Sequence, residues 1–375
     1  MGVVQTVSGR AFLRDMPWHL LLGAAVLSVI GAAFIRSSHS ALFAEKHLLF
    51  AAIGCTVFLA VAFLDYRHLA SVAPLLYGAG LAALAALFVL GVTINYARSW
   101  FNVGFFTVQP SEPMKYVLVV VLADYFRLRR RLDRLRDLLP PLVLTGVPVG
   151  LIMLEPDFGT ALVVLPIFFV MAFLAGVPVR NLVTVVLIGC ALFAAAWCTP
   201  GLLKGYQKSR LISFIDPAGN PNSPAAYNAE QATTAVSSGG LAGQGWGQGV
   251  LTRLGRIPEQ YADFIFAVIA EEWGFVRTAP MVCLYLVLVV LLAGIARATA
   301  DPFGRLLVGG VLAVFALQSF LHIAISLRLA PITGLTLPLV SYGGSSLVST
   351  FAGFGLVASV RMHRTVEFAG GFVGG

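Results

Sequence analysis

The chain has 375 residues, of which 58% are apolar and only 11% are charged. An average soluble domain is about 25% charged, so this composition excludes an ordinary soluble enzyme and indicates a protein that lies largely in a membrane. The net charge of +8 does not indicate nucleic-acid binding, because six arginines fall within the single short segment 127–136 between two apolar stretches.

Apolar stretches recur along the whole chain, and each is long enough to cross a bilayer as a helix. We therefore predict an all-α polytopic membrane protein with about ten transmembrane helices, forming a single membrane domain over residues 1–375. No disulfide framework or zinc site is expected from the four cysteines. The predicted spans lie near 18–35, 48–64, 70–93, 111–126, 138–154, 159–176, 181–198, 278–296, 305–326 and 346–362.

Basic residues are distributed asymmetrically between the loops. If the arginine-rich segment 127–136 is cytoplasmic, ten spans place both termini in the cytoplasm as well. The short loops on the outer side then carry only Arg36, Lys46, Arg98 and Arg328, and the other side carries the excess of arginine. This asymmetry agrees with the positive-inside rule and supports the predicted orientation.

The fourth span begins with two charged residues, Glu112 and Lys115, which share one face of a helix because they are three positions apart. Burying them in a membrane costs several kcal/mol unless they pair or contact a polar ligand. Two interpretations stay open. The pair joins helices or lies in the outer headgroup layer, or it forms a charged element beside an anionic substrate.

One long polar segment, 199–261, separates the seventh predicted span from the eighth and is expected to be an extracytoplasmic loop. A connection of this length is usually functional, as a lid or a substrate groove, although a disordered connector is the alternative. Its apolar residues favour short interfacial helices joined by glycine turns. Its basic residues, either solvated or binding an anion, are Lys204, Lys208, Arg210, Arg253 and Arg256.

Acidic residues cluster where this loop gives way to the eighth span. Asp263 lies at the border between polar and apolar sequence, with Glu259 one turn earlier. A partly desolvated carboxylate there can act as a general base toward a hydroxyl group, and a helix-start aspartate is the alternative. Glu271 and Glu272 are expected to cap the loop or pair with its arginines rather than to catalyse.

A second irregular segment, 329–345, is apolar but broken by prolines and glycines, which predicts a re-entrant loop packed against the bundle. His322 is expected to be a packing histidine bonded to a neighbour. The sequence has no phosphate-binding loop, no HExxH and no GxSxG motif.

Several ordered motifs resemble those of the SEDS family (shape, elongation, division and sporulation). They are QPSEPMK in the fourth span, EPDFGTALVVL before the sixth, then YQKSRLISFIDP, SSGGLAGQGWGQG, IPEQYADFIFAVIAEEWG and PITGLTLPLVSYGGSS. The resemblance covers nearly the whole chain. The GWGQG run, followed by a proline and a glutamate before ADFIF, is more similar to the RodA branch than to the FtsW branch. Pro113, Glu155 and His322 depart from the usual family residues.

The resemblance implies a peptidoglycan glycosyltransferase that polymerises lipid II into glycan strands at the outer face of the bacterial cytoplasmic membrane during elongation. The essential aspartate of the family falls on Asp263, and the matching fourth-span residues are Glu112 and Lys115. The resemblance also implies a class B penicillin-binding protein as partner. On this interpretation Asp263 is the general base, Lys115 and Arg210 assist the departing diphosphate, and Lys208 and Glu259 contribute to substrate binding.

Three alternatives remain beside this interpretation. A lipid II flippase would use Glu112 and Lys115 to line a translocation path, a division-specific FtsW-type polymerase would share the chemistry, and a scaffold protein would not need Asp263. The notable polar residues concentrate at the outer border, which favours chemistry over transport. The sequence identifies no cofactor, and a divalent cation such as magnesium stays open.

Overall fold

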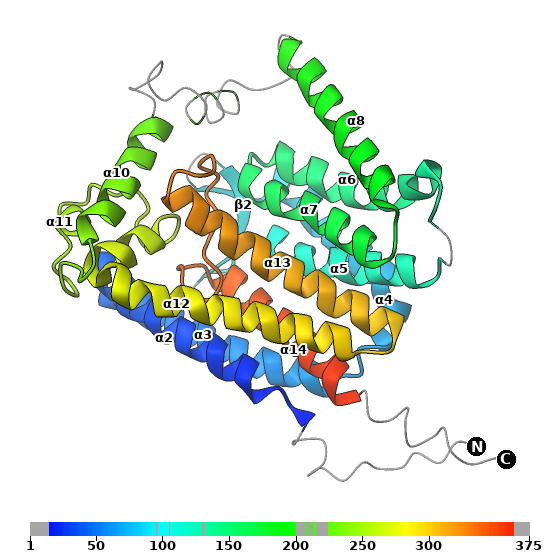
Figure 1. Cartoon of the computed structure of the whole chain (residues 1–375), viewed down its shortest axis with the longest axis horizontal. Coiled ribbons are helices and arrows are strands. Elements are labelled where there is room, and N and C mark those ends of the chain that lie inside the picture. Colours follow the sequence, from blue (N-terminus) through cyan, green and yellow to red (C-terminus); the bar gives the residue numbers. More distant parts are fainter. Residues whose placement is uncertain are drawn as a thin grey trace.

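The computed structural model describes residues 15–94, 97–104, 106–129, 132–199, 208, 212, 214 and 224–363. Within these residues the chain forms a bundle of long helices (Figure 1). The membrane-length and shorter apolar helices are α2 (Trp18–Ser38), α3 (Ala41–Phe63), α4 (His68–Leu90), α5 (Ser111–Arg127), α6 (Leu139–Leu154), α7 (Phe158–Leu174), α8 (Val179–Cys198), α12 (Ile265–Ala298), α13 (Pro302–Ser326) and α14 (Gly344–Met362). The remaining elements are the 3₁₀ helix η1 (Leu135–Leu138), α10 (Pro224–Gly239), α11 (Val250–Arg253), β1 (Val92–Ile94), β2 (Ala97–Asn102) and β3 (Thr107–Val108).

Each of the ten predicted apolar stretches coincides with a helix, so the polytopic helical fold is confirmed. Eight helical segments of the described chain are long and apolar enough to cross a membrane, with η1 and α6 counted together as Leu135–Leu154. The other two, α5 and α7, are shorter, with 17 residues each. The exact number of spans, and the single domain over 1–375, stay predictions.

The centre of the bundle is formed by α13 and α14. Within their most apolar 18-residue stretches, 67% of the residues of α13 and 72% of those of α14 are buried, against 17% for α4 and 11% for α8. Figure 1 shows α8 extending away from the other helices. Close packing at the centre depends on small residues, because a Cβ atom at Gly353 would lie 2.3 Å from the ring of Tyr116 and one at Gly310 would lie 2.4 Å from Val119.

A small antiparallel sheet, which the sequence did not predict, connects α4 to α5. Its strands follow the order β1-β2-β3, with Val92 opposite Trp100 and Phe101 opposite Val108. Arg98 on β2 donates hydrogen bonds of 2.8 Å to the carbonyl oxygens of Gly91 and Val89, at the end of α4. The sheet therefore lies against the end of α4, and its strand β2 carries the aromatic residues Trp100 and Phe101.

Helix α12 is broken at Gly274, where φ is 68° and ψ is −178°. The loop that precedes α12 supplies the missing partners. The amides of Gln244 and Gly245 donate to the carbonyl oxygens of Glu271 and Glu272, at 3.0 and 2.9 Å. On the other side of the break, the amides of Phe275 and Val276 donate to Gly240 and Leu241, at 2.9 and 3.1 Å. A helix can break at this depth because the loop satisfies its backbone groups.

The predicted loop 199–261 is described only in part. Its described portion contains α10 and α11, with positive φ angles at several glycines between them, including Gly243 and Gly247. This agrees with the expectation of short helices joined by glycine turns. Helix α10 packs against α12, where a Cβ atom at Gly239 would lie 2.0 Å from the carbonyl oxygen of Ala270. The extracytoplasmic location of the loop stays a prediction.

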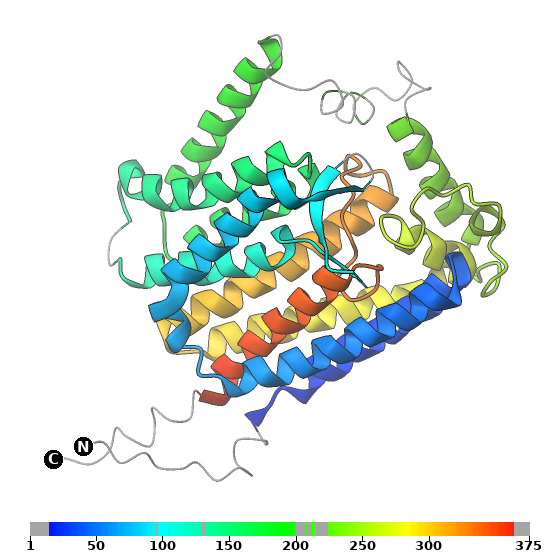
Figure 2. The ribbon, with the colours of Figure 1, turned by 180° about the vertical axis from the view of Figure 1, so that it is seen from behind.

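Helix α2 begins and α14 ends at the same end of the bundle (Figure 2). Helix α14 begins at the opposite end, where the re-entrant segment that precedes it is located. The segment packs against the bundle as predicted, because Leu335, Leu337, Leu339 and Val340 are all buried, and its re-entry into the membrane stays a prediction. The side of the membrane on which the termini lie stays a prediction.

Candidate active site

Asp263 lies two residues before the start of α12, in a tight turn. The amides of Ala262 and Asp263 both donate to the carbonyl oxygen of Glu259, at 3.0 and 2.9 Å. Glu259 has a positive φ of 42°, which a non-glycine residue rarely adopts. The flanking residues Ile257 and Phe264 are buried, and they anchor both ends of the turn. The turn is therefore held in a defined conformation, with Asp263 half-buried at its end.

The re-entrant segment between α13 and α14 holds this turn from the other side. The amide of Tyr342 donates to the carbonyl oxygen of Tyr261 at 3.0 Å. The hydroxyl of Ser341 donates to the carbonyl oxygen of Ala262 at 2.6 Å and accepts the amide of Leu337 at 2.8 Å. Two segments about 80 residues apart are thus joined immediately beside Asp263.

Asp263 and Glu259 line a cavity of about 830 Å³. The volume falls within the range of about 300–1,000 Å³ typical of small-molecule sites. The cavity walls combine a third carboxylate, Asp157, with an amide, several hydroxyl groups and aromatic rings, and no lysine or arginine is among its described lining residues. The polar and aromatic lining residues include Phe50, Trp100, Phe106, Gln109, Tyr261, Thr336, Tyr342, Ser345 and Ser346.

Aromatic residues make one wall of the cavity rigid. The ring of Tyr261 stacks on His39 with centroids 4.5 Å apart, and Phe43 lies against Tyr342 at 4.8 Å. Burial is the largest cause that raises the pKa of Tyr261 to about 12, and the negative charges of Glu259 and Asp263 add to it. Tyr261 therefore keeps its proton at neutral pH and can donate a hydrogen bond.

Glu112 and Lys115 form a buried ion pair behind the cavity wall. The ammonium of Lys115 lies 3.0 and 2.9 Å from the two carboxylate oxygens of Glu112, and the side chain of Lys115 is 1% exposed. It also donates to the side-chain oxygen of Gln318 at 2.7 Å. The amide nitrogen of Gln318 in turn donates to the carbonyl and hydroxyl oxygens of Thr336, at 3.1 and 3.2 Å. Lys115 thus reaches the cavity through Gln318 and Thr336, and the described cavity wall does not include it.

Asp157 organises a second part of the wall, which sequence reasoning did not single out. As the N-cap of α7 it accepts the amide of Thr160 at 3.1 Å and its hydroxyl at 2.7 Å. It also accepts the side-chain amide of Gln109 at 2.8 Å and the hydroxyl of Ser111 at 3.3 Å. An aspartate three residues before a threonine at the start of an apolar run is a helix-cap signal, but the contact with Gln109 could not be predicted from it.

The predicted basic residues of the loop are not brought to the cavity in the described structure. Lys208 donates to the carbonyl oxygen of Trp197 at 3.0 Å and lies over its ring, 5.4 Å from the centroid. Arg210 lies outside the described residues. Among the described residues, no group of three acidic, histidine or cysteine side chains converges as metal ligands.

Of the two roles expected for Glu271 and Glu272, the described structure shows capping of the loop and not pairing with its arginines. Glu271 accepts the amides of Leu251 and Thr252, at 2.7 and 3.1 Å. Glu272 accepts the amide of Gly247 at 3.0 Å and the hydroxyl of Ser37 at 2.5 Å. Backbone amides can bind a buried carboxylate without bringing a second long side chain into the core, so the loop itself supplies the compensating donors.

His322 is fully buried and its Nδ1 lies 2.7 Å from the carbonyl oxygen of Leu335. This contact confirms the expected packing role. Because Leu335 belongs to the re-entrant segment, the histidine helps to fix that segment on α13.

Comparisons with known proteins place this fold and site in a family. Residues 15–366 match the cell cycle protein family of FtsW, RodA and SpoVE. The peptidoglycan glycosyltransferase RodA of Treponema pallidum is 30% identical, over 94% of this chain and 99% of its own. The probable peptidoglycan glycosyltransferase FtsW of Bacillus subtilis is 34% identical, over 94% of this chain and 92% of its own.

A solved structure supports the same assignment. A chain from a peptidoglycan synthase complex that coordinates polymerization and crosslinking is 34% identical, with a TM-score of 0.82 over 93% of this chain and 98% of that chain. The family match covers the helical bundle, the Asp263 turn and the re-entrant segment together. The chain therefore belongs to the SEDS family of cell cycle proteins, with FtsW, RodA and SpoVE.

Proposed function

We propose that this protein is a peptidoglycan glycosyltransferase of the RodA type, which polymerises lipid II during cell elongation. The observation that carries the proposal is the position of Asp263 in a polar cavity of about 830 Å³ at one end of an otherwise apolar bundle. The relatives named as peptidoglycan glycosyltransferases support the reaction. The FtsW-type division polymerase is the alternative, because identities of 30% to RodA and 34% to FtsW do not separate the two.

Asp263 acts as the general base in the proposed mechanism. The 4-hydroxyl oxygen of an acceptor sugar attacks C1 of a lipid-linked sugar, forming the C1–O bond while the bond from C1 to the diphosphate oxygen breaks. The hydroxyl proton passes to the carboxylate of Asp263, and undecaprenyl diphosphate leaves with the bonding electrons. Attack from the side opposite the leaving group inverts the configuration at C1.

Neighbouring residues position this carboxylate and the substrate. Ser341 and Tyr342 fix the turn that carries Asp263. Glu259 and Tyr261 lie in the same wall and can hydrogen-bond sugar hydroxyl groups. The Lys115–Glu112 pair supports the cavity wall at Thr336 through Gln318, so we assign Lys115 a positioning role and a long-range electrostatic contribution to the departing diphosphate.

The substrate diphosphate needs positive charge that the described cavity wall does not contain. We propose that Arg210 and Lys208 in the long loop supply it, Lys208 after it leaves its contact with the carbonyl oxygen of Trp197. The loop 199–261 is then extracytoplasmic and lies beside the cavity, which places the reaction at the outer face of the cytoplasmic membrane with both termini inside.

The proposed partner is a class B penicillin-binding protein, which supplies crosslinking. This is supported by the similarity to a chain from a solved peptidoglycan synthase complex. A flippase remains the rival activity. The buried polar residues Glu112, Lys115, Gln318 and His322 lie near one end of their helices rather than along the full depth of the bundle, which favours a reaction at one membrane face.

A two-part assay with one preparation separates these activities. Purified protein in liposomes, with and without its penicillin-binding partner, receives fluorescent lipid II that is accessible on one face. The proposal predicts long glycan strands on a gel and no increase in the rate of lipid II translocation over empty liposomes. Translocation without polymer from folded protein would contradict the polymerase and support the flippase.

A further inference from the structure

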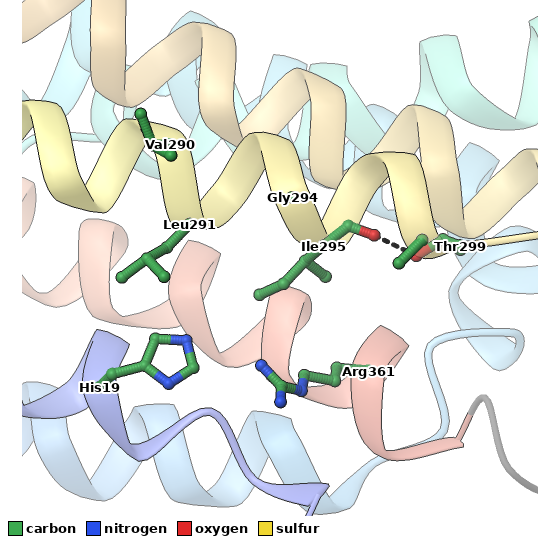
Figure 3. Close-up of a pocket in the computed structure, with 8 residues that line it drawn as sticks. His19, Val290, Leu291, Gly294, Ile295, Thr299 and Arg361 are labelled. Carbon is green, nitrogen blue, oxygen red and sulfur yellow. Dashed lines mark hydrogen bonds between the residues drawn. The ribbon is translucent and has the colours of Figure 1, made fainter.

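A second pocket lies at the end of the bundle opposite the Asp263 cavity, between α2, α12 and α14 (Figure 3). Its volume is about 310 Å³. Figure 3 shows His19 of α2 and Arg361 of α14 side by side below the apolar side chains of α12. None of its lining residues belongs to the proposed catalytic site.

The two ionisable side chains of this pocket, His19 and Arg361, are basic, and none of its lining residues is acidic. The hydroxyl of Thr299, the other polar side chain in the lining, donates to the carbonyl oxygen of Ile295 at 2.7 Å. Arg361 makes no hydrogen bond or ion pair with any residue of the described chain, although it is half-buried. A guanidinium group in that position has five donors available for an anion and is well suited to a phosphate group. A zwitterionic headgroup would find no carboxylate here for its cation.

The position and the apolar lining of the pocket suit a lipid better than a free anion. His19 is the second residue of α2, and Arg361 lies in the last turn of α14, so both are at the level where helices leave the membrane. The apolar wall extends along α12 from Thr299 to Val290, a distance of about 13 Å at 1.5 Å per residue. This distance leads from the headgroup level into the hydrocarbon region.

The pocket wall that α12 forms has an open space at its centre, beside Gly294. A Cβ atom at Gly294 would meet no other atom within 4 Å, while Leu291 and Ile295 border the space on either side. An acyl chain can therefore lie against the backbone of α12 at Gly294 with its phosphate near Arg361.

We propose that this pocket binds one anionic glycerophospholipid of the adjacent leaflet. Arg361 binds the phosphate oxygens, the imidazole of His19 donates a further hydrogen bond, and one acyl chain lies along α12 from Ile295 to Val290. Basic pockets between transmembrane helices commonly bind anionic headgroups in this way. The bound lipid joins α2, α12 and α14 at the end of the bundle where the termini lie.

Native mass spectrometry of the full-length protein in detergent tests the proposal, with phosphatidylglycerol and phosphatidylcholine of identical acyl chains as probes. The wild type should retain one phosphatidylglycerol in preference to phosphatidylcholine. Arg361→Gln should weaken phosphatidylglycerol retention about fivefold, since one basic residue near the surface contributes about that factor. Gly294→Leu, which fills the apolar wall, should weaken both lipids at this position.

Matched controls come from the same chain. Arg297→Gln removes an exposed arginine in the last turn of α12 that does not line the pocket, and Gly146→Leu fills another open, exposed glycine, on α6. Both should retain lipid like the wild type. Glycerol phosphate added in excess should not displace the lipid, because it lacks the acyl chain.

Thermal unfolding of each variant shows whether it is folded, and phosphatidylglycerol should raise the melting temperature of the wild type more than that of Arg361→Gln. Equal retention of the two lipids by the wild type, or an equal effect of Arg361→Gln and Arg297→Gln, would overturn the proposal. Displacement by glycerol phosphate would show an anion site without a lipid requirement and would equally contradict it.

Discussion

Asp263 and Gly334 lie against each other in the wall of the cavity. The carboxylate oxygen Oδ2 of Asp263 is 3.5 Å from the position that a Cβ atom at residue 334 would occupy, and Gly334 has a φ of +74°. Any other residue at 334 would therefore strain the backbone and place a side chain directly beside the proposed base.

Gly334→Val should therefore lower polymerisation by about 10- to 100-fold, the loss expected when a catalytic group is displaced by about 1 Å. The measurement is the rate of glycan-strand formation from lipid II. Gly255→Val is the matched control, because Gly255 also has a positive φ, of +62°, but has open space around its Cβ position. An equal loss in both variants would show that backbone strain alone, and not proximity to Asp263, lowers the activity.

The buried ion pair of Glu112 and Lys115 gives a prediction about stability. Lys115→Met leaves an uncompensated buried carboxylate, so it should destabilise the protein by about 3–5 kcal/mol. The double variant Glu112→Gln, Lys115→Met removes both charges and should regain much of this loss. Thermal unfolding in detergent measures both. The exposed pair of Asp124 and Arg127 is the control, and Asp124→Asn should change stability by less than about 1 kcal/mol. If the double variant loses as much stability as Lys115→Met and Glu112→Gln lose in sum, the pairing would be contradicted.

Glu155, in the turn between α6 and α7, gives a prediction about pH. Both its carboxylate oxygens are buried without a hydrogen-bond partner in the described structure. Burial, followed by the charge of Asp157, raises its pKa from 4.5 to about 8. The folded state then binds more protons than the unfolded state between these two values, so stability falls as the pH rises from about 4.5 to about 8.

Glu155→Gln should flatten this dependence and make the protein more stable than the wild type above pH 8, because it keeps a neutral group of similar shape. Melting temperatures measured across the pH range test this. Glu45→Gln, at an exposed position of α3, should leave the slope unchanged. If Glu155→Gln also leaves the slope unchanged, Glu155 does not bind a proton in the folded protein at neutral pH.

Glu271 gives a prediction about the loop. Its carboxylate accepts three hydrogen bonds from Leu251 and Thr252, so Glu271→Ala should release the segment around α11. Amide hydrogen exchange should rise there and remain slow in α14. Glu230→Ala, on the exposed face of α10, should leave exchange around α11 unchanged. Equal exchange in Glu271→Ala and the wild type would remove this anchor from the account.

The sequence predicted the features that depend on local pattern. The helices follow from apolar runs, the Glu112–Lys115 pair follows from spacing on one helix face, and Asp263 stands where polar sequence gives way to apolar sequence. Contacts between distant segments could not be predicted in this way. The placement of Asp263 beside Gly334 depends on the tertiary fold, as does the contact of Asp157 with Gln109.

The sequence leaves the role of Glu271 open for the same reason. It allows Glu271 to cap the loop or to pair with an arginine, and the actual donors are backbone amides of a loop, which every sequence contains. The break at Gly274 was also missed, because an apolar helix with one glycine is compatible with a continuous helix. Its stability depends on the loop residues that bond to it from another part of the chain.

The central claim is that the carboxylate of Asp263 is the general base. The most direct test compares wild type and Asp263→Asn, purified with the penicillin-binding partner and supplied with labelled lipid II, after thermal unfolding has shown that both are folded. The account predicts glycan strands from the wild type and a loss of at least about 100-fold in Asp263→Asn, the lower range for a general base. Equal polymer from both proteins would contradict the account and remove Asp263 from the mechanism.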